Sequence, residues 1–250
     1  MTDVLGYRAK FGVLGPATNT IVQPDFDDLR PEGVTNHYSR IYVENASAIS
    51  NESFMTGTMV ISDNTLDAVK GVMPCAPDYL VMGMSAVTFY GGAEGCVEWK
   101  KHIEDYSGLK ISVGSESLIK AIEAYGGIKK VAFMSPYYPV ANEEVANFLS
   151  DYGIETVRDT CLRCPSWTAI AEVPTDKTRQ VMHDLNGDGD DVDAIIQVGT
   201  NLSAIKLAAE LEQEFAKPVI AINTATYWHA LRTYGINDQV SGFGRLLEEF

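Results

Sequence analysis

Hydrophobic and polar positions along the chain alternate between two spacings. Short runs of β-branched and other apolar residues predict buried strands, and they lie at 11–14, 38–43, 79–84, 110–113, 130–134, 154–158, 193–198 and 218–222. Helical patterns separate these runs and lie at roughly 53–72, 92–106, 116–125, 140–152, 175–185, 202–215 and 225–234. This alternation predicts an α/β fold built on mainly parallel sheets with helices on both faces.

The order of these segments contains an internal repeat. The strand and helix start at 111–117 resemble those at 220–226, and the two helices then match at a constant offset of 109 positions. Gly126 and Gly235 share this offset and stand where a helix C-cap is expected. Other pairs recur in the same order, namely 79–85 with 194–200 and 11–19 with 131–142. Repeats in one order predict duplicated structural units.

We therefore expect two Rossmann-like halves related by a pseudo-twofold axis, with the ligand site between them. The boundaries that the repeat suggests are 1–115 plus 224–250 for the first half and 116–223 for the second.

Polar loops follow the predicted strands at the edge where open parallel sheets bind ligands. These loops are rich in Gly, Ser, Thr and Asn, contain no Lys or Arg, and in several cases continue directly into helices. Free N–H groups at helix starts bind carboxylates or phosphates without a cation, although the same residues also serve as N-caps. The candidate substrate-binding residues are Pro16, Asn19, Gly83, Met84, Gly199, Asn201, Asn223 and Thr224.

Charge and composition restrict the partners. The chain of 250 residues has 34 acidic and 19 basic residues and a net charge of −15, which argues against nucleic acid or an anionic membrane as partner. It has neither a nucleotide-binding glycine motif nor a metal-ligand spacing. The acidic stretch 186–191 lacks the later Glu of a calcium loop and predicts a solvated turn. Because no apolar run approaches roughly 20 residues, and no signal-type segment opens the chain, we expect a cytoplasmic protein.

The cysteines and one histidine leave alternatives open. Four cysteines are too few for a disulfide scaffold, so we expect reduced thiols. Cys161 and Cys164 form a single CxxC that either packs or supplies a displaced thiol to the cleft. His229, about one turn into the last predicted helix, is either an acid/base candidate or a packing residue.

Several of these segments resemble one known family. Residues 16–20 (PATNT) resemble the substrate-carboxylate loop of maleate cis-trans isomerases, and 82–90 (MGMSAVTFY) resemble the MGTSLSFY segment of arylmalonate decarboxylases. Residues 135–137 (SPY), followed by Asn142-Glu143, resemble the loop that presents a tyrosine in both. Residues 227–232 (YWHALR) and 242–246 (GFGRL) resemble FWDAVR and GYGRL near the end of the decarboxylases.

The resemblance spans nearly the whole chain and identifies it as a member of the aspartate/glutamate racemase superfamily. It implies two pseudo-symmetric α/β domains, a small carboxylic acid as substrate and no cofactor. The catalytic cysteines of that family are missing, since the matching positions fall on Gly83 and Gly199, give or take one residue. Without an adjacent base, the hydroxyl of Ser85 or Thr200 cannot replace a thiol, so two-base racemisation and cysteine-dependent isomerisation are disfavoured.

An arrangement that stabilises an anion remains, with Ser85, Tyr137 and Thr200 as the candidate catalytic residues. Backbone N–H groups and hydroxyls there would hold a carboxylate as it becomes an enediolate. We therefore expect a cofactor-free, decarboxylase-like lyase or isomerase of a small carboxylic or dicarboxylic acid. The proton donor would be a hydroxyl, water or His229. The alternatives are a carboxylate-binding protein without catalysis and a hydrolase with a Ser or Thr nucleophile, and a homo-oligomer remains open.

Overall fold

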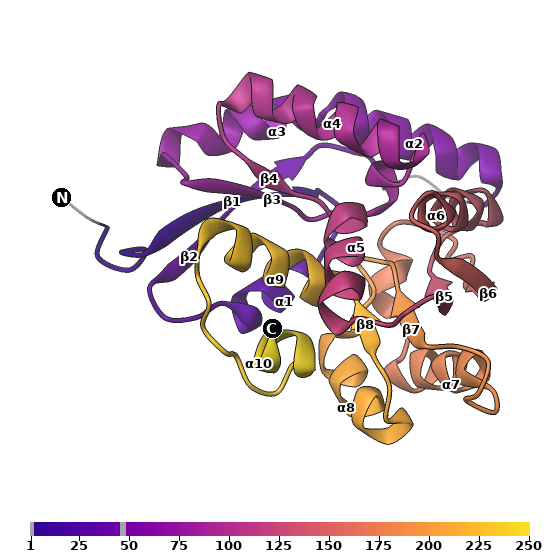
Figure 1. Ribbon diagram of the computed structural model, residues 1–250. Coiled ribbons are helices and arrows are strands. Elements are labelled where there is room, and N and C mark those ends of the chain that lie inside the picture. The colour runs from indigo at the N-terminus through magenta and orange to yellow at the C-terminus, as the bar shows by residue number, and fades with distance from the viewer. Residues whose placement is uncertain (1–2, 46–48) are drawn as a thin grey trace.

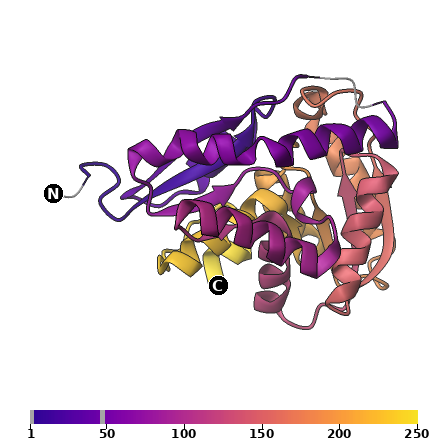
Figure 2. The same ribbon diagram turned by 90° about the horizontal axis from the view of Figure 1, so that it is seen from above.

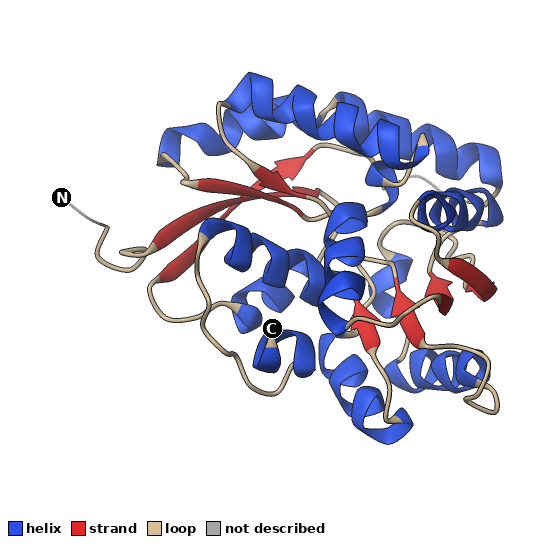
Figure 3. Ribbon diagram, in the orientation of Figure 1, coloured by secondary structure: helices blue, strands red, loops and turns tan. Residues whose placement is uncertain are grey.

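The computed structural model describes residues 3–45 and 49–250, and its strands form two parallel sheets of four (Figure 3). The first sheet has the order β2-β1-β3-β4 and consists of β1 (Ala9–Pro16), β2 (Val34–Ile41), β3 (Tyr79–Met82) and β4 (Ile111–Ser112). The second has the order β6-β5-β7-β8 and consists of β5 (Lys130–Ser135), β6 (Glu155–Cys161), β7 (Ala194–Gln197) and β8 (Val219–Ala221). The two orders are identical when four is added to each strand number, so the halves share one topology.

Helices cover both faces of each sheet (Figure 1). They are α1 (Val22–Leu29), α2 (Asn51–Asp63), α3 (Thr65–Val72), α4 (Gly92–Ser107), α5 (Gly114–Tyr125), α6 (Pro139–Asp151), α7 (Thr175–Asn186), α8 (Ile205–Phe215), α9 (Ile222–Tyr234) and α10 (Arg245–Glu249). Short 3-10 turns cover Met73–Cys75, Ala86–Thr88 and Ala169–Glu172. The predicted α/β fold with parallel sheets and helices on both faces is confirmed.

All eight predicted strands are present, and the largest shift is in the second. The pattern placed it at 38–43, but β2 begins at Val34 and ends at Ile41, because it pairs along the whole length of β1. The polar, half-buried residues Thr35, Asn36 and His37, which follow the buried Val34, concealed this start. The helix expected at 53–72 is divided into α2 and α3 at Asn64. The pattern did not predict α1, whose Pro24 lies in the first turn, where proline costs no hydrogen bond.

The matching helices of the repeat, α5 and α9, pack against each other between the sheets (Figures 1 and 2). Each ends at a glycine with a positive φ angle, 70° at Gly126 and 94° at Gly235, as predicted for helix C-caps. Although α9 follows β8 of the second sheet, it packs on β3 and β4 of the first. The chain therefore crosses between the halves at these helices.

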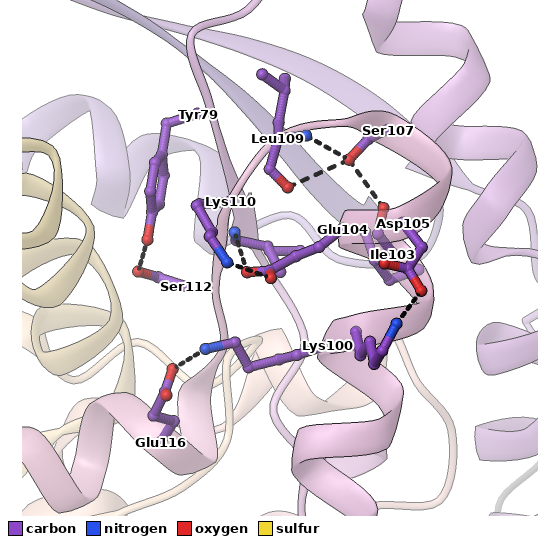
Figure 4. Close-up of polar contacts among 12 residues, drawn as sticks. Tyr79, Lys100, Ile103, Glu104, Asp105, Ser107, Leu109, Lys110, Ser112 and Glu116 are labelled. Carbon is purple, nitrogen blue, oxygen red and sulfur yellow. Dashed lines mark hydrogen bonds and ion pairs between the residues drawn. The ribbon is translucent and has the colours of Figure 1, made fainter.

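Polar contacts fix α4 to β4 and to the start of α5 (Figure 4). Lys100 pairs with Glu116 at 2.5 Å, and Lys110 pairs with Glu104 at 2.8 Å. The hydroxyls of Tyr79 on β3 and Ser112 on β4 lie 3.0 Å apart. These contacts hold the first turn of α5 in place beside the loop that follows β3.

The acidic segment 186–191 forms the expected turn. Lys217 donates from Nζ to the carbonyl oxygens of Gly189 at 2.5 Å and Val192 at 2.8 Å, and Arg158 pairs with Asp191 at 2.5 Å. Within residues 3–45 and 49–250, no helix has the length and apolar character required to cross a bilayer.

Candidate functional site

Segments that follow β1, β3, β5, β6 and β7 meet where the two halves face each other. They enclose a cavity of about 20 Å³, which has room for roughly one water molecule. Its lining is formed by Pro16, Thr18, Asn19, Met84, Tyr137, Trp167, Ile170, Thr200 and Asn201. The structure thus brings together six candidate residues from loops of both halves, namely Pro16, Asn19, Met84, Tyr137, Thr200 and Asn201.

The hydroxyls of Ser85 and Tyr137 form the centre of the site. Ser85 Oγ donates to the carbonyl of Val198 at 2.5 Å, so its only proton is used there. Tyr137 must therefore donate to Ser85 Oγ, which lies 3.0 Å from the phenolic oxygen. Both residues are buried. One tyrosine proton is thus held in a fixed direction across the two halves.

Backbone N–H groups of Thr200 and Ala86 lie near the Tyr137 oxygen. Burial raises the pKa of Tyr137 to about 12, while the Ser85 hydroxyl and the N–H groups of Thr200 and Ala86 oppose that rise. Because burial dominates, the phenol keeps its proton at neutral pH. The Tyr137 hydroxyl and the two N–H groups are neutral donors gathered in one buried place, an arrangement that can stabilise an oxyanion.

The segment that carries Tyr137 is held by side chains and by the loop after β6. Ser135 Oγ donates to Asn142 Oδ1 at 2.5 Å and accepts the Tyr137 N–H at 3.1 Å. The N–H groups of Arg163 and Cys164 donate to the carbonyls of Tyr137 and Pro136 at 3.1 and 3.0 Å. Both ends of the Pro136–Tyr137 turn are therefore fixed.

Two asparagines connect the halves beside the cavity. Asn19 Nδ2 donates to Thr200 Oγ1 at 3.2 Å, while Asn19 Oδ1 accepts the N–H groups of Ile21 and Val22 at the start of α1. Asn201 Oδ1 accepts the Thr20 N–H at 2.9 Å. Asn19 therefore binds N–H groups at the start of α1 and also lines the cavity, so the two roles that the sequence left open occur together.

The glycines at the expected cysteine positions lie behind the cavity. A Cβ atom at Gly199 would lie 2.4 Å from Cδ of Pro136, and one at Gly83 would lie 3.1 Å from the Leu14 carbonyl oxygen. A side chain at Gly199 requires Pro136 to move, and Pro136 precedes Tyr137. The placement of Tyr137 and a side chain at Gly199 are therefore in conflict.

Asn223 and Thr224 point in different directions from the start of α9. Asn223 lies behind Thr200 and donates from Nδ2 to the Thr200 carbonyl at 3.0 Å. Thr224 lines a separate cavity of about 10 Å³ together with Tyr125 and Glu212. Consecutive helical residues are rotated by about 100°. The structure thus places Asn223 next to the site and Thr224 away from it.

His229, Cys161 and Cys164 lie outside the lining of the cavity. His229 Nδ1 lies 2.9 Å from Ser117 Oγ between α5 and α9, and burial lowers its pKa. Burial raises the pKa of both Cys161 and Cys164 to about 11, so both thiols are protonated at neutral pH. Among the described residues that line the cavity there is no cysteine and no histidine.

The cavity also has an aromatic wall. Trp167 and Phe54 stack with ring centroids 5.0 Å apart, and Phe54 lies 5.0 Å from the Tyr137 ring. The sequence pattern does not decide whether Trp167 lies in a pocket or in the core, and it does not single out Thr18 or Ile170 as site residues. One signal was available: Gly57 interrupts a helical pattern, and a Cβ atom there would lie 2.7 Å from the Trp167 ring.

Metal ligation has no support in residues 3–45 and 49–250, where no three His, Cys, Asp or Glu side chains are grouped to hold an ion.

Comparisons with known proteins give consistent relatives. The model of the arylmalonate decarboxylase family matches residues 22–247. The arylmalonate decarboxylase of Bordetella bronchiseptica is 25% identical over 170 residues, 68% of this chain and 70% of that protein. The maleate isomerase of Pseudomonas putida is 22% identical over 250 residues, which cover 95% of this chain and 96% of the relative.

Solved structures agree with the fold. The maleate cis-trans isomerase of Nocardia farcinica, in a mutant with a covalently bound succinylcysteine intermediate, superposes with a TM-score of 0.86 at 20% identity over 97% of this chain and 99% of that one. Unliganded arylmalonate decarboxylase superposes with a TM-score of 0.78 at 21% identity over 97% and 100% of the two chains.

Proposed function

The chain belongs to the arylmalonate decarboxylase family, and from that membership and the geometry of the site we propose a cofactor-independent lyase or isomerase of a small carboxylic or dicarboxylic acid. The observation that carries the proposal is the buried cluster in which Tyr137 donates to Ser85 Oγ beside the N–H groups of Ala86 and Thr200. Neutral donors in a buried site stabilise a negative charge that develops on a substrate oxygen.

Decarboxylation is the reaction that this cluster supports best. The bond between the α-carbon and one carboxylate breaks, carbon dioxide leaves, and the electron pair moves into the remaining carboxyl group as an enediolate. The N–H groups of Ala86 and Thr200 would bind an oxygen of that enediolate, and a proton then returns to carbon. Because the cavity measures only about 20 Å³, substrate entry requires its lining side chains to move.

We assign the proton transfer to Tyr137. Its pKa, raised to about 12 by burial, keeps the proton available, and Ser85 fixes its direction. The phenolate that forms would then take a proton from water. The Nocardia isomerase forms a covalent bond to a cysteine, whereas packing against Pro136 fills the space of a side chain at Gly199 here. The proposed reaction therefore proceeds without a cysteine.

A serine hydrolase receives less support. Ser85 donates its proton to a backbone carbonyl, and its other contact is the protonated Tyr137. Neither partner is a base that could activate a nucleophile. A protein that binds a carboxylate without chemistry remains an outcome of the test below.

The test is proton NMR of the purified protein in D₂O with maleate, substituted malonates, 2-hydroxy acids and β-hydroxy acids. Turnover or deuterium uptake at carbon, lost in Ser85→Ala and Tyr137→Phe, would support the enediolate enzyme. Binding shifts without chemistry for every acid would replace the proposal with a carboxylate-binding protein.

A further inference from the structure

A buried carboxylate lies behind the site, in a part of the fold that the proposed reaction does not use. Asp25 lies in the first turn of α1 and is 7% exposed. Asn223 Nδ2 donates to Asp25 Oδ2 at 2.8 Å and also to the Thr200 carbonyl at 3.0 Å. Asn223 thus connects the carboxylate to Thr200, whose N–H lies near the Tyr137 oxygen.

We propose that Asp25 is a positioning residue that acts through Asn223 to hold the Thr200 main chain in the orientation that binds the substrate. The inference rests on the proposed function, because it assigns the Thr200 N–H to the carboxylate of the acid.

The hydrogen-bond chemistry of Asn223 carries the argument. The Thr200 carbonyl only accepts, and so does an ionised Asp25, so both face the NH₂ group of the amide. Asn223 Oδ1 is buried without a partner in the described structure. An orphaned acceptor is costly, so the amide keeps this orientation because both acceptors require it.

Protonation of Asp25 removes one of these requirements. A carboxylic acid can donate to Asn223 Oδ1, which favours the flipped amide and leaves the Thr200 carbonyl facing an oxygen. Burial raises the pKa of Asp25 to about 6, against the opposing hydrogen bond from Asn223. The orientation of Thr200 would therefore be secured above this pH and relaxed below it.

Asp25 has its own access to solvent. It lines a pocket of about 350 Å³ between α1, α7 and α8 that shares no lining residue with the site cavity. Protons can therefore reach Asp25 while the cavity stays closed.

The charges around Asp25 permit this titration. Asp28 raises and Lys206 lowers its pKa, and these two form an ion pair at 3.1 Å. Arg179 and Glu210 also line the pocket and pair with each other. Burial raises the pKa of Tyr38 on β2 and of Tyr227 on α9, so both stay neutral. No charge in the described surroundings is left over to fix Asp25 in one state.

The experiment follows the Thr200 backbone amide and the Asn223 side-chain amide by ¹⁵N NMR between about pH 4.5 and 8, a range that spans the titration of a buried carboxyl. Wild type should show both signals moving together with a midpoint near pH 6. Asp28→Asn, on the same helix, should keep this transition, while Asp25→Asn should abolish it. Asn223→Ala should leave the Thr200 amide unresponsive.

A Thr200 amide that does not move in this range, or that still titrates in Asp25→Asn, would overturn the inference. Under the panel assay, Asp25→Asn should lower kcat/KM by about tenfold through kcat, since the misplaced N–H is needed in the transition state. Titration without turnover of any acid would uphold the network and reject the function. Turnover of an acid without titration of the two amides would uphold the proposed function and reject the role of Asp25.

Discussion

Tyr137 differs from an ordinary buried tyrosine because its proton has one defined acceptor, Ser85, and backbone N–H groups lie near its oxygen. If it transfers the proton, Tyr137→Phe should fold normally and lower kcat/KM by about 100-fold or more. Tyr79→Phe is a matched control, since it removes a buried hydroxyl contact of the same 3.0 Å length to Ser112. Steady-state kinetics of both variants measure the two losses of kcat/KM. Equal losses in the two would mean that only packing had been disturbed.

Close packing against Pro136 leaves no room for a cysteine side chain at Gly199. Gly199→Ala should lower the free energy of unfolding by about 1–3 kcal/mol, because Cβ would overlap Pro136 Cδ at 2.4 Å. Gly15→Ala is the control, since its Cβ would meet only Val22 at an ordinary 3.4 Å. Urea denaturation measures both. If Gly199→Ala left the free energy of unfolding unchanged, Pro136 would move at little cost and the position would accept a side chain.

Asp25 should make stability fall as pH rises. Its folded pKa of about 6 lies above the ordinary 3.8, so the folded state holds the proton more tightly than the unfolded state. The contribution is fully present below about pH 4 and is lost as pH rises through 6. Unfolding free energies at pH 4.5 and 7 should differ less in Asp25→Asn than in wild type or Asp28→Asn. An unchanged difference would contradict the raised pKa.

At the scale of elements, the glycine inside α2 serves the aromatic wall. In an exposed helix, replacing glycine by alanine gains about 0.5–1 kcal/mol. Here the Cβ would lie 2.7 Å from the Trp167 ring, so Gly57→Ala should instead destabilise the protein and shift tryptophan emission. Thr56→Ala, on the exposed side of the same helix, should leave the emission unchanged. If Gly57→Ala stabilised the protein and left the tryptophan emission unchanged, Trp167 would not pack against Gly57 as the structure places it.

The helices and strands show which parts of the fold can be predicted from the sequence. Periodicity predicted the strands and most helices, because burial on one or both faces imposes a regular spacing. It missed α1, whose Pro24 looked like a breaker although the first turn tolerates it. It could not separate Asn223 from Thr224, because their directions depend on how α9 packs. The position of Trp167 over Gly57 likewise follows from tertiary contact between segments far apart in the chain.

The whole molecule combines symmetric topology with unequal chemistry. Both halves have the same strand order, but Gly114 packs closely against Ser85 in one, while Asn223 bonds to the Thr200 carbonyl in the other. Hydrogen bonds from Asn19 to Thr200 and from Thr20 to Asn201 cross between the halves. The site is therefore complete only where the two halves meet.

The central claim is that this junction processes an acid without a thiol. The most direct test is the D₂O NMR assay on a chain in which Cys75, Cys96, Cys161 and Cys164 are all replaced by serine or alanine, beside Tyr137→Phe. The account predicts that the folded cysteine-free chain keeps its turnover or deuterium uptake, while Tyr137→Phe loses it. Activity that disappears from a folded cysteine-free chain but persists in Tyr137→Phe would contradict the account and assign the chemistry to a displaced thiol.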